Sequence, residues 1–533
     1  MVLKSLATVS PAKKWLGFVT AIWIQAIAGN NYTFSNYSGA LKSLMVLTQL
    51  QLNNLSVAKD VGKAFGILSG LASDRFPTSV ILMIGAVEGL IGYGVQWLVV
   101  SQHISPLPYW QMCIFLCLGG NSTTWMNTAV LVTCMRNFKN NQGPVSGILK
   151  GYLGLSTAIF TDLSTALFSS SPSSFLLSLA IIPVIICVAA ALFLQEAPPS
   201  SIEKKQQPLI FKILNILAFT VAFYLLAFDV TGKHGPNLSS LFAIGLLVLL
   251  VAPLIVPAYF LLAQPSFTSD VESTTSEPLI IQNVAKNVSI MEDMAKVKEK
   301  PMIGEDHTIF EALKTFDFWV LFLSFLCGVG TGMCVINNLG QMGGALGYAD
   351  VSIFVSLTSI WGFFGRIISG MASEHCIRKY STPRPFWNAA SQILMVAGYI
   401  CMALAFPGSL YMGSIVVGIC YGVRLAVTVP VASELFGLKH FGLMYNVLIL
   451  NLPLGSFLFS GLLAGYVYDS EATESSQGGN TCSGSHCYRL VFVVMAFACI
   501  VGFVLDMILA VRTRKLYFKI HQNMKSSTDA ALS

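Results

Sequence analysis

Charged side chains are scarce in this chain of 533 residues. Only 11% of its residues are charged and 54% are hydrophobic, whereas soluble proteins carry about 25% charged residues. So few charges cannot coat a water-soluble globule, and the 35 phenylalanines would collapse rather than stay disordered. The composition therefore excludes a soluble enzyme and a disordered chain, and it predicts that a lipid bilayer surrounds most of the surface.

Motifs of enzyme chemistry are also missing. The sequence has no phosphate-binding P-loop, no His-Glu-x-x-His motif and no Gly-x-Ser-x-Gly motif, and its 7 histidines are scattered. We therefore expect no enzymatic activity, no cofactor and no resident metal. The net charge of +6 is mild, and we expect no nucleic-acid partner.

Hydrophobic stretches long enough to span a membrane recur along the whole chain. A spanning helix needs about 20 mostly apolar residues. The predicted fold class is therefore an all-α polytopic membrane protein. We predict about fourteen spans, at residues 15–38, 56–74, 79–101, 108–135, 144–168, 173–195, 209–230, 238–263, 317–339, 350–373, 386–406, 408–434, 441–467 and 488–511.

The basic residues are distributed unevenly between the two predicted sides of the membrane. With the N-terminus in the cytosol, most of the 31 basic residues fall at cytosolic positions, and only Lys42, Lys59, Lys233 and Arg489 fall outside. Cytosolic loops are enriched in Lys and Arg, so we expect both termini in the cytosol. The pattern fits the plasma membrane and an endomembrane such as the vacuole equally.

One short segment occurs twice in the chain. Ser69–Arg75 (SGLASDR) is matched 300 residues later by Ser369–His375 (SGMASEH), and the same offset places stretch 108–135 on 408–434. A chance likeness of two helix ends is the alternative, but the shared register downstream favours a duplication. We predict two six-helix halves at 1–195 and 317–511, an inserted helix pair at 196–263, a flexible cytosolic linker at 264–316 and a basic cytosolic tail at 512–533.

The repeated segment resembles a loop of the major facilitator superfamily, whose pattern is G-x-x-x-D-R/K-x-G-x-R/K. Gly70, Asp74 and Arg75 fit this pattern, while Pro77 and Ser79 depart from it. The resemblance implies two six-helix bundles and a latch between them on the cytosolic side. We assign to this latch Gly70, Asp74, Arg75, Arg366, Gly370 and Glu374.

Three further segments resemble the plant nodulin-like branch of that superfamily, which includes the nuclear-fusion-defective proteins. They are Ala58–Gly62 (AKDVG), Gly147–Ser156 (GILKGYLGLS) and Ser433–Gly442 (SELFGLKHFG). The last segment is also similar to the oxalate/formate and monocarboxylate carriers. The likeness to the nodulin-like branch covers nearly the whole chain.

Charged side chains inside the predicted helices are candidates for contact with a solute. Each costs at least ~2.5–3.5 kcal/mol unless it faces protein or water. Arg424 aligns with Thr124 at the repeat offset and could fork two donors onto a carboxylate; the alternative is an interhelical lock. Lys150 could contact the solute, or it could cross a close helix contact to reach an acid.

Two carboxylates and several uncharged polar side chains complete the predicted site. Buried carboxylates can take up and release a proton, so we assign proton coupling to Glu88 and Asp162. Their alternative role is an ion pair with Lys63, Lys150 or Arg366. The predicted solute site consists of Arg424, Lys150, Asn121, Thr124, Gln25, Asn31, Asn337, Asn338 and Asn451.

The predicted outer loop near the C-terminus holds two cysteines, in the sequence Cys482-Ser-Gly-Ser-His-Cys487. An oxidising exterior permits a disulfide between them. Free thiols are the second possibility, and a metal site with His486 is the third. Two sulfurs and one imidazole are too few for a closed zinc site, so a disulfide is the leading expectation.

The expected function is that of a secondary carrier. A small polar or anionic solute would bind near the midplane between the halves, and rocking of the halves would expose it to each side in turn. We also expect proton coupling and a monomer. The alternative is a non-transporting membrane sensor or scaffold that signals through the polar linker 264–308. The charges inside the predicted helices favour the carrier.

Overall fold

The computed structural model of the chain is almost entirely helical. Two short strands, β1 (Thr473–Glu474) and β2 (Asn480–Thr481), pair antiparallel before the last helix. The predicted all-α fold class is confirmed, and most of the predicted linker 264–316 lies outside the described residues. The structure describes residues 11–29, 34–47, 49–168, 171–197, 201–231, 235–262, 301–348, 352–471, 473–474 and 480–529.

The first half of the chain forms one bundle, followed by the inserted segment. The predicted span 15–38 is divided, because α1 ends at Ile27 and α2 begins at Ser35, and the predicted span 56–74 is broken at Phe65. The helices of the bundle are α1 (Pro11–Ile27), α2 (Ser35–Leu44), α3 (Gln49–Ala64), α4 (Gly66–Ser73), α5 (Thr78–Val100), α6 (Tyr109–Asn137), α7 (Gln142–Phe168) and α8 (Pro172–Phe193), with the 3₁₀ turn η2 (Lys139–Asn141) between α6 and α7. The inserted segment contains α9 (Ser201–Thr231), α10 (Pro236–Val251), the 3₁₀ turn η3 (Ala252–Leu254) and α11 (Ile255–Leu262).

The second half forms the other bundle. Two of its membrane-length segments contain π-helical turns, η4 (Leu326–Gly330) and η5 (Ser456–Ala464). Its helices are α13 (Ile309–Leu313), α14 (Phe316–Phe325), α15 (Thr331–Ala345), α16 (Ser352–Tyr380), α17 (Pro385–Leu404), α18 (Ser409–Phe436), α19 (Phe441–Ile449), α20 (Asn451–Gly455), α21 (Gly465–Glu471) and α22 (His486–Asp529).

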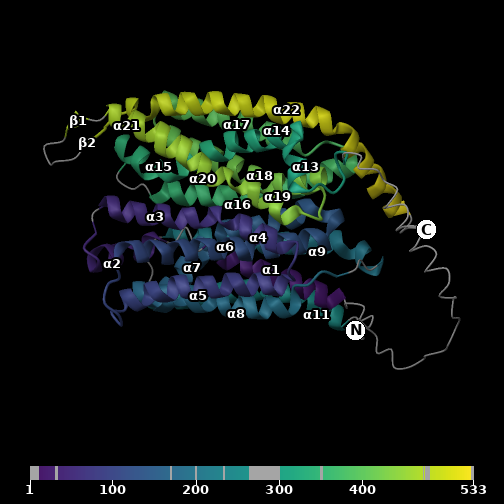
Figure 1. Cartoon of the computed structure of the whole chain (residues 1–533), viewed down its shortest axis with the longest axis horizontal. Helices are drawn as coiled ribbons and strands as arrows, with labels where there is room; N and C mark the ends of the chain where they lie inside the picture. The colour runs from purple at the N-terminus through teal and green to yellow at the C-terminus, as the bar shows by residue number, and fades with distance from the viewer. Residues whose placement is uncertain are drawn as a thin grey trace.

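The two bundles lie side by side, and their helices run close to the long axis of the molecule (Figure 1). The start of α1 and the end of α22 lie at one end, while α2, β1 and β2 lie at the other. At the first end, Lys14 Nζ lies 4.6 Å from the ring centre of Phe138, and His521 Nδ1 lies 3.0 Å from the Ile377 carbonyl oxygen. The start of α1 and the end of α22 therefore agree with an even number of crossings between them.

The chain is an integral, multi-pass membrane protein. Nine helices of the described residues are long and apolar enough to cross a membrane. The other predicted spans fall on α1, α3–α4, α6, α7 and α16, which bury polar side chains such as Lys59, Asn121, Lys150 and Arg366. In α6, α7 and α16 such side chains lower the hydropathy although they face protein rather than lipid. In contrast, α1 has 17 residues, and α3 and α4 have 16 and 8, so each is shorter than a typical spanning helix. The total of about fourteen spans therefore stays a prediction.

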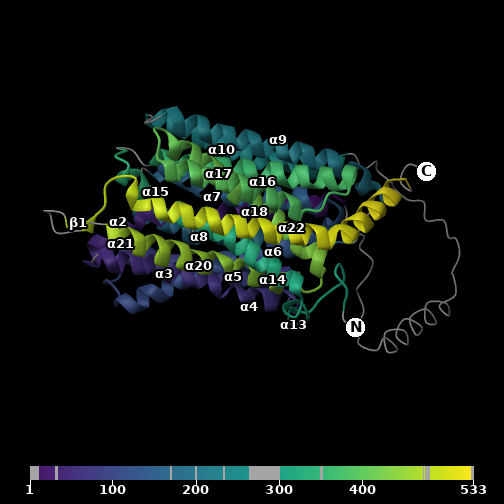
Figure 2. The same cartoon turned by 90° about the horizontal axis from the view of Figure 1, so that it is seen from above.

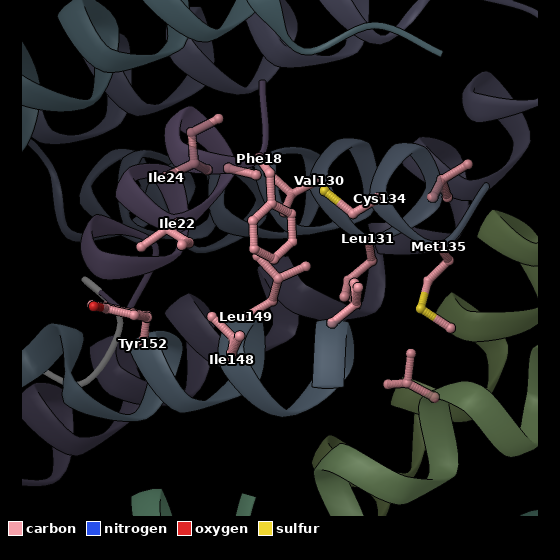
Figure 3. Packing of buried hydrophobic residues seen from close by; sticks show 14 of the residues in the cluster. Phe18, Ile22, Ile24, Val130, Leu131, Cys134, Met135, Ile148, Leu149 and Tyr152 are labelled. Atoms are coloured by element: carbon pink, nitrogen blue, oxygen red, sulfur yellow. The ribbon is translucent and has the colours of Figure 1, made fainter. Parts of the chain in front are cut away.

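Large apolar side chains fill the interior of the first bundle. Phe18 and Ile22 on α1 meet Val130 on α6 and Leu149 on α7 (Figure 3). All four side chains are 1% exposed or less. Tight packing of this kind holds helices together in lipid, where apolar surface gains little from burial.

Close contacts between the bundles repeat with the two halves exchanged. A Cβ atom added to Gly70 on α4 would lie 2.7 Å from the Leu443 Cα atom on α19. A Cβ atom added to Gly370 on α16 would lie 2.6 Å from the Gly143 carbonyl oxygen on α7. Adding 300 to 70 and 143 gives 370 and 443. The two contacts are thus equivalent, as expected for two repeats that face each other.

The inserted helices pack along one edge, beside α16 of the second bundle (Figure 2). The Trp23 indole on α1 donates a hydrogen bond to the Leu250 carbonyl at 2.7 Å, close to Pro253, where α10 is interrupted. Phe219 on α9 stacks on Phe364 of α16 with ring centres 5.7 Å apart. The inserted segment therefore contacts both bundles.

Candidate functional site

A cavity of about 330 Å³ lies between the two bundles. We call it the central cavity; its walls come from α3, α6 and α7 of the first bundle and from α15, α16, α18, α19 and α20 of the second. Small-molecule sites have volumes of about 300–1,000 Å³, so the central cavity is large enough for a small solute. Its polar lining residues are Lys63, Thr123, Thr124, Asn127, Lys150, Thr157, Thr358, Ser359, Arg366, Tyr421 and Tyr445.

The Lys, Arg, Asp and Glu side chains that line the central cavity are all basic. They are Lys63, Lys150 and Arg366, and no acidic side chain is among the described lining residues. Lys63 is paired at 2.8 Å with Asp60, whose side chain is 43% exposed and is not part of the cavity lining. Like charges in a low-dielectric space repel one another strongly, so these basic groups disfavour a further cation in the central cavity.

Lys150 is the most buried of these cations, with 2% of its surface exposed. Its Nζ atom donates hydrogen bonds to the Tyr445 hydroxyl and, at 3.3 Å, to Asn127 Oδ1. The Asn127 amide donates to the same hydroxyl at 2.8 Å, and Gln25 Nε2 donates to Asn127 Oδ1 at 2.9 Å. This network joins α1, α6 and α7 of the first bundle to α19 of the second.

Arg366 lies at the central cavity rather than in the predicted latch. Its side chain is on α16, two turns before Glu374, and the guanidinium lies against Gly154 of α7. A Cβ atom at position 154 would overlap the Arg366 Nη1 atom. Glycine at this position therefore gives the guanidinium its room beside the cavity.

Arg424 lies outside the central cavity. It forms an ion pair with Asp506 of α22, and neither side chain is exposed. Ser324 Oγ donates to Asp506 Oδ1 at 2.7 Å and accepts from Arg424 Nη2 at 3.2 Å. Tyr421 and Leu425 of the same helix line the cavity, so the helix turns Arg424 into its own bundle. This geometry is that of an interhelical lock.

Two predicted solute-site residues on α6, Asn121 and Thr124, have different surroundings. Thr124 lines the central cavity, whereas the Asn121 amide donates to Glu88 Oε2 at 2.9 Å. Glu88 lies in a shallow groove along the outer face of α5, with Val80 and Val87 as exposed neighbours. The structure therefore places Glu88 away from the cavity.

The remaining predicted polar residues are dispersed. Asn337 and Asn338 on α15 donate to Ser456 at 2.9 Å and to Ser460 at 2.8 Å, which ties α15 to η5 within one bundle. Asn451 is fully buried on α20. None of these three residues lines the central cavity, nor does Asp162 of α7. Asn31 lies outside the described residues.

The predicted latch residues of the first bundle hold the connection between α18 and α19. Asp74 Oδ2 lies 2.6 Å from His440 Nδ1, and Asp74 Oδ1 lies 3.8 Å from Arg136 Nη2. Arg136 also donates to the carbonyls of Leu438 at 3.1 Å and Lys439 at 2.7 Å. Arg75 is exposed beside this contact.

The equivalent residues of the second bundle hold the connection between α6 and α7. Glu374 accepts a hydrogen bond from the Gly143 amide at 3.3 Å and from Arg384 at 2.6 Å. Arg378 donates to the Asn140 carbonyl and to Asn141 Oδ1 at 2.9 Å. The latch is thus built twice, once from each repeat.

Further bonds close the space between the latch and the central cavity. Ser146 Oγ donates to the Ala426 carbonyl at 2.7 Å, and the Asn446 amide donates to Thr128 Oγ1 at 2.9 Å. Ser433 Oγ lies 2.8 Å from Gln142 Oε1. The structure is therefore closed at the end that the basic residues predict to be cytosolic.

The cysteines of the predicted outer loop are bonded to each other. Cys482 and Cys487 form a disulfide with a Cα–Cα distance of 5.9 Å. His486 Nε2 lies 3.7 Å from Cys482 Sγ. Both sulfurs that a metal would require are used in the disulfide. The group of Cys482, His486 and Cys487 is therefore a disulfide-closed loop.

Two residues of the site, Asn127 and Tyr445, are not in the predicted solute site. Asn127 continues the spacing of Asn121 and Thr124 along α6, so its sequence position carried a usable signal. Tyr445 carried none, because aromatic residues are common in membrane helices and its repeat equivalent is Val145. Its place beside Lys150 depends on how the bundles meet.

Comparison with known proteins identifies relatives along nearly the whole chain. The pattern of the Nodulin-like family matches residues 14–258, and that of the NFD4 C-terminal domain matches residues 302–519. The Arabidopsis thaliana protein NUCLEAR FUSION DEFECTIVE 4 is 32% identical, over 97% of this chain and 92% of that protein. The probable transporter MCH1 of Yarrowia lipolytica is 28% identical, over 36% of this chain and 43% of that protein.

Among solved structures, a membrane transporter shares the architecture at low sequence identity. It is the crystal structure of the major facilitator superfamily transporter FucP in the outward conformation. The similarity covers 93% of this chain and 98% of that chain, with a TM-score of 0.50 and 12% identity. The likeness is one of fold.

Proposed function

The chain belongs to the nodulin-like family and has the major facilitator fold, and from this premise we propose that it carries a small organic anion across a membrane by alternating access. Family and fold are those of membrane transporters rather than enzymes. We further propose that the solute is an anion, that transport is coupled to protons, that the carrier is a monomer and that both termini are cytosolic.

The observation that carries the proposal is the charge of the central cavity. Lys150 and Arg366 approach the same space from opposite bundles, and the described lining contains no acid. A carboxylate between them would bridge the two halves, with Arg366 able to donate two parallel hydrogen bonds. The attraction between the carboxylate and each of these side chains is stronger where water is excluded.

The apolar part of the lining favours an organic anion over an inorganic one. Met333 and Ile336 on α15, Leu425 on α18 and Leu452 on α20 face the same cavity. Small-molecule sites commonly combine such apolar walls with a few polar groups that fix orientation. A solute with one anionic group and an apolar body would satisfy both parts of the wall.

The doubled latch supports alternating access. Two equivalent sets of contacts, around Asp74 and around Glu374, close one end of the pathway. Breaking both sets and rocking the bundles about the central cavity would open that end. With cytosolic termini, the described conformation is closed to the cytosol; the similar FucP structure is in an outward conformation.

A thermal unfolding screen of the purified full-length protein tests the proposal. The sodium salts of acetate, benzoate, succinate and citrate are compared with sodium chloride at equal ionic strength, and with neutral sugars. We expect at least one organic anion to raise the unfolding midpoint, because a bound ligand stabilises the folded state. Stabilisation by sugars alone would refute an anionic solute.

Two variants test whether the anion binds in the central cavity. Arg366→Gln should abolish the anion-dependent shift, because it removes a cation of the central cavity. Arg489→Gln removes an equal charge at an exposed position of α22 and should keep the shift. If both variants keep the shift, the anion binds elsewhere.

A further inference from the structure

We propose that Lys150 is the proton-coupling residue of this protein, and that its amine gains a proton as the anion binds and loses it as the anion leaves. The proposal rests on the anion transport proposed above. It differs from the expectation drawn from the sequence, which assigned coupling to the carboxylates Glu88 and Asp162.

The partners of Lys150 are neutral. Its Nζ atom is bonded to a phenol, Tyr445, and to an amide, Asn127, and it lies 4.7 Å from the Tyr445 ring centre. Only 2% of the residue is exposed. A protonated amine in such a place lacks both bulk water and a counter-charge, which disfavours its charged form.

The charged groups around Lys150 act in the same direction. Arg366 of α16 and Lys63 of α3 share the central cavity with it, and both are cations. From α18 the cavity is faced by the phenol of Tyr421, and the Gln25 amide of α1 is bonded to Asn127, a partner of Lys150. Protonation of Lys150 therefore adds positive charge to an already positive cavity.

An arriving anion reverses this balance. It supplies a counter-charge to Lys150, so the anion and the proton stabilise each other's binding. Because such coupling is reciprocal, each must raise the affinity for the other by the same factor. The anion and the proton together add no net charge to the cavity, so no unpaired charge is buried when the solute is bound.

The proton step is simple and needs no further reactant. The Nζ lone pair of the neutral amine accepts one proton from water on the open side, and the same proton returns to water on the other side after the anion leaves. The Tyr445 hydroxyl can donate to the neutral amine and accept from the charged one. Its hydrogen bond to Lys150 therefore persists in both states.

The carboxylates are less suited to this role by position. Glu88 lies in the outer groove of α5 and is bonded to Asn121. Asp506 is locked to Arg424 inside the second bundle. Neither they nor Asp162 are among the described residues that line the central cavity, so a solute there would not contact them.

Calorimetric titration in two buffers tests the proposal. The full-length protein is titrated with whichever of acetate, benzoate, succinate or citrate stabilises it most, in Tris and in HEPES. Because these buffers differ in ionisation enthalpy, the difference in heat gives the protons taken up for each anion bound. We expect uptake of about one proton by the unchanged protein at a pH where the amine is neutral without the anion.

Variants assign the proton. Lys150→Arg keeps a fixed positive charge and should bind the anion with no proton uptake, and Lys150→Met should lose both the uptake and most of the affinity. Glu88→Gln is the matched control and should behave like the unchanged protein.

The outcomes separate the two proposals. If no anion of the panel binds the unchanged protein, the proposed function fails. If an anion binds but without proton uptake, or if uptake persists in Lys150→Arg or disappears in Glu88→Gln, the role of Lys150 is refuted while anion binding stands.

Discussion

The buried pair of Arg424 and Asp506 allows a prediction that separates a structural charge from a solute-binding one. Both side chains are fully buried inside the second bundle, and Ser324 bonds to both of them. Arg424→Leu strands a carboxylate away from water, and Asp506→Leu strands a guanidinium. The double variant removes both charges together.

The expected effects differ in size. Breaking a buried ion pair from one side costs about 3–5 kcal/mol, whereas replacing both partners with apolar residues is often neutral or stabilising. Ser324 is not left unsatisfied in the double variant, because its hydroxyl also reaches the Leu321 carbonyl at 3.3 Å. We therefore expect each single variant to lose about 3 kcal/mol or more and the double variant to recover most of that loss.

The assay is the free energy of unfolding of the detergent-solubilised protein for the four members of the cycle. The anion-dependent shift of the unfolding midpoint is recorded in the same samples. The double variant should keep that shift, because Arg424 lies outside the central cavity. A stable Arg424→Leu protein that has lost the anion response would refute this reasoning and return Arg424 to the solute site.

Three further predictions follow from the geometry. Gly154→Leu should abolish the anion-dependent shift, because any side chain at this position displaces the Arg366 guanidinium beside the cavity. The control is Gly94→Leu, where a Cβ meets no atom within 4 Å, and this variant should keep the shift. Equal losses in both variants would refute the assignment of Arg366 to the solute site. Cys482→Ser should lower the free energy of unfolding by about 2 kcal/mol through loss of a short covalent loop and should leave anion binding intact, and mass spectrometry after alkylation without reductant should show two protected cysteines in the unchanged protein. The double variant of Asp74→Asn and Glu374→Gln should weaken both copies of the latch. A thiol introduced in the cavity should then react several times faster with a membrane-impermeant maleimide added from the latch side. An unchanged rate would show that the latch does not hold that end closed.

The membrane class and the fold could be predicted because they depend on averages. A charged fraction of 11% and a hydrophobic fraction of 54% exclude a surface that faces water. The repeat between Ser69–Arg75 and Ser369–His375 predicted two facing bundles, and the exchanged contacts of Gly70 and Gly370 agree with it. Such features survive any small error in where a helix starts or how it is rotated.

The candidate site could be predicted only in part. Lys150, Arg366 and Arg424 all lie in hydrophobic stretches, and the sequence marks each as exceptional by the energy of placing a charge in lipid. That energy is recovered equally by a cavity or by a buried partner. Sequence alone thus favoured Arg424 as the solute contact and Arg366 as a latch residue, whereas the structure places Arg366 at the central cavity and pairs Arg424 with Asp506 inside the second bundle.

The sequence by itself determined that this chain is a membrane protein, that it contains an internal repeat and that basic residues lie within its hydrophobic helices. Only the tertiary structure decided which cations share an open space: Arg366 faces the central cavity across Gly154, and Arg424 faces Asp506. The reason is geometric. Successive residues of a helix point about 100° apart, so the side chain that meets a cavity depends on the rotation of each helix, and that rotation is set by packing between segments hundreds of residues apart.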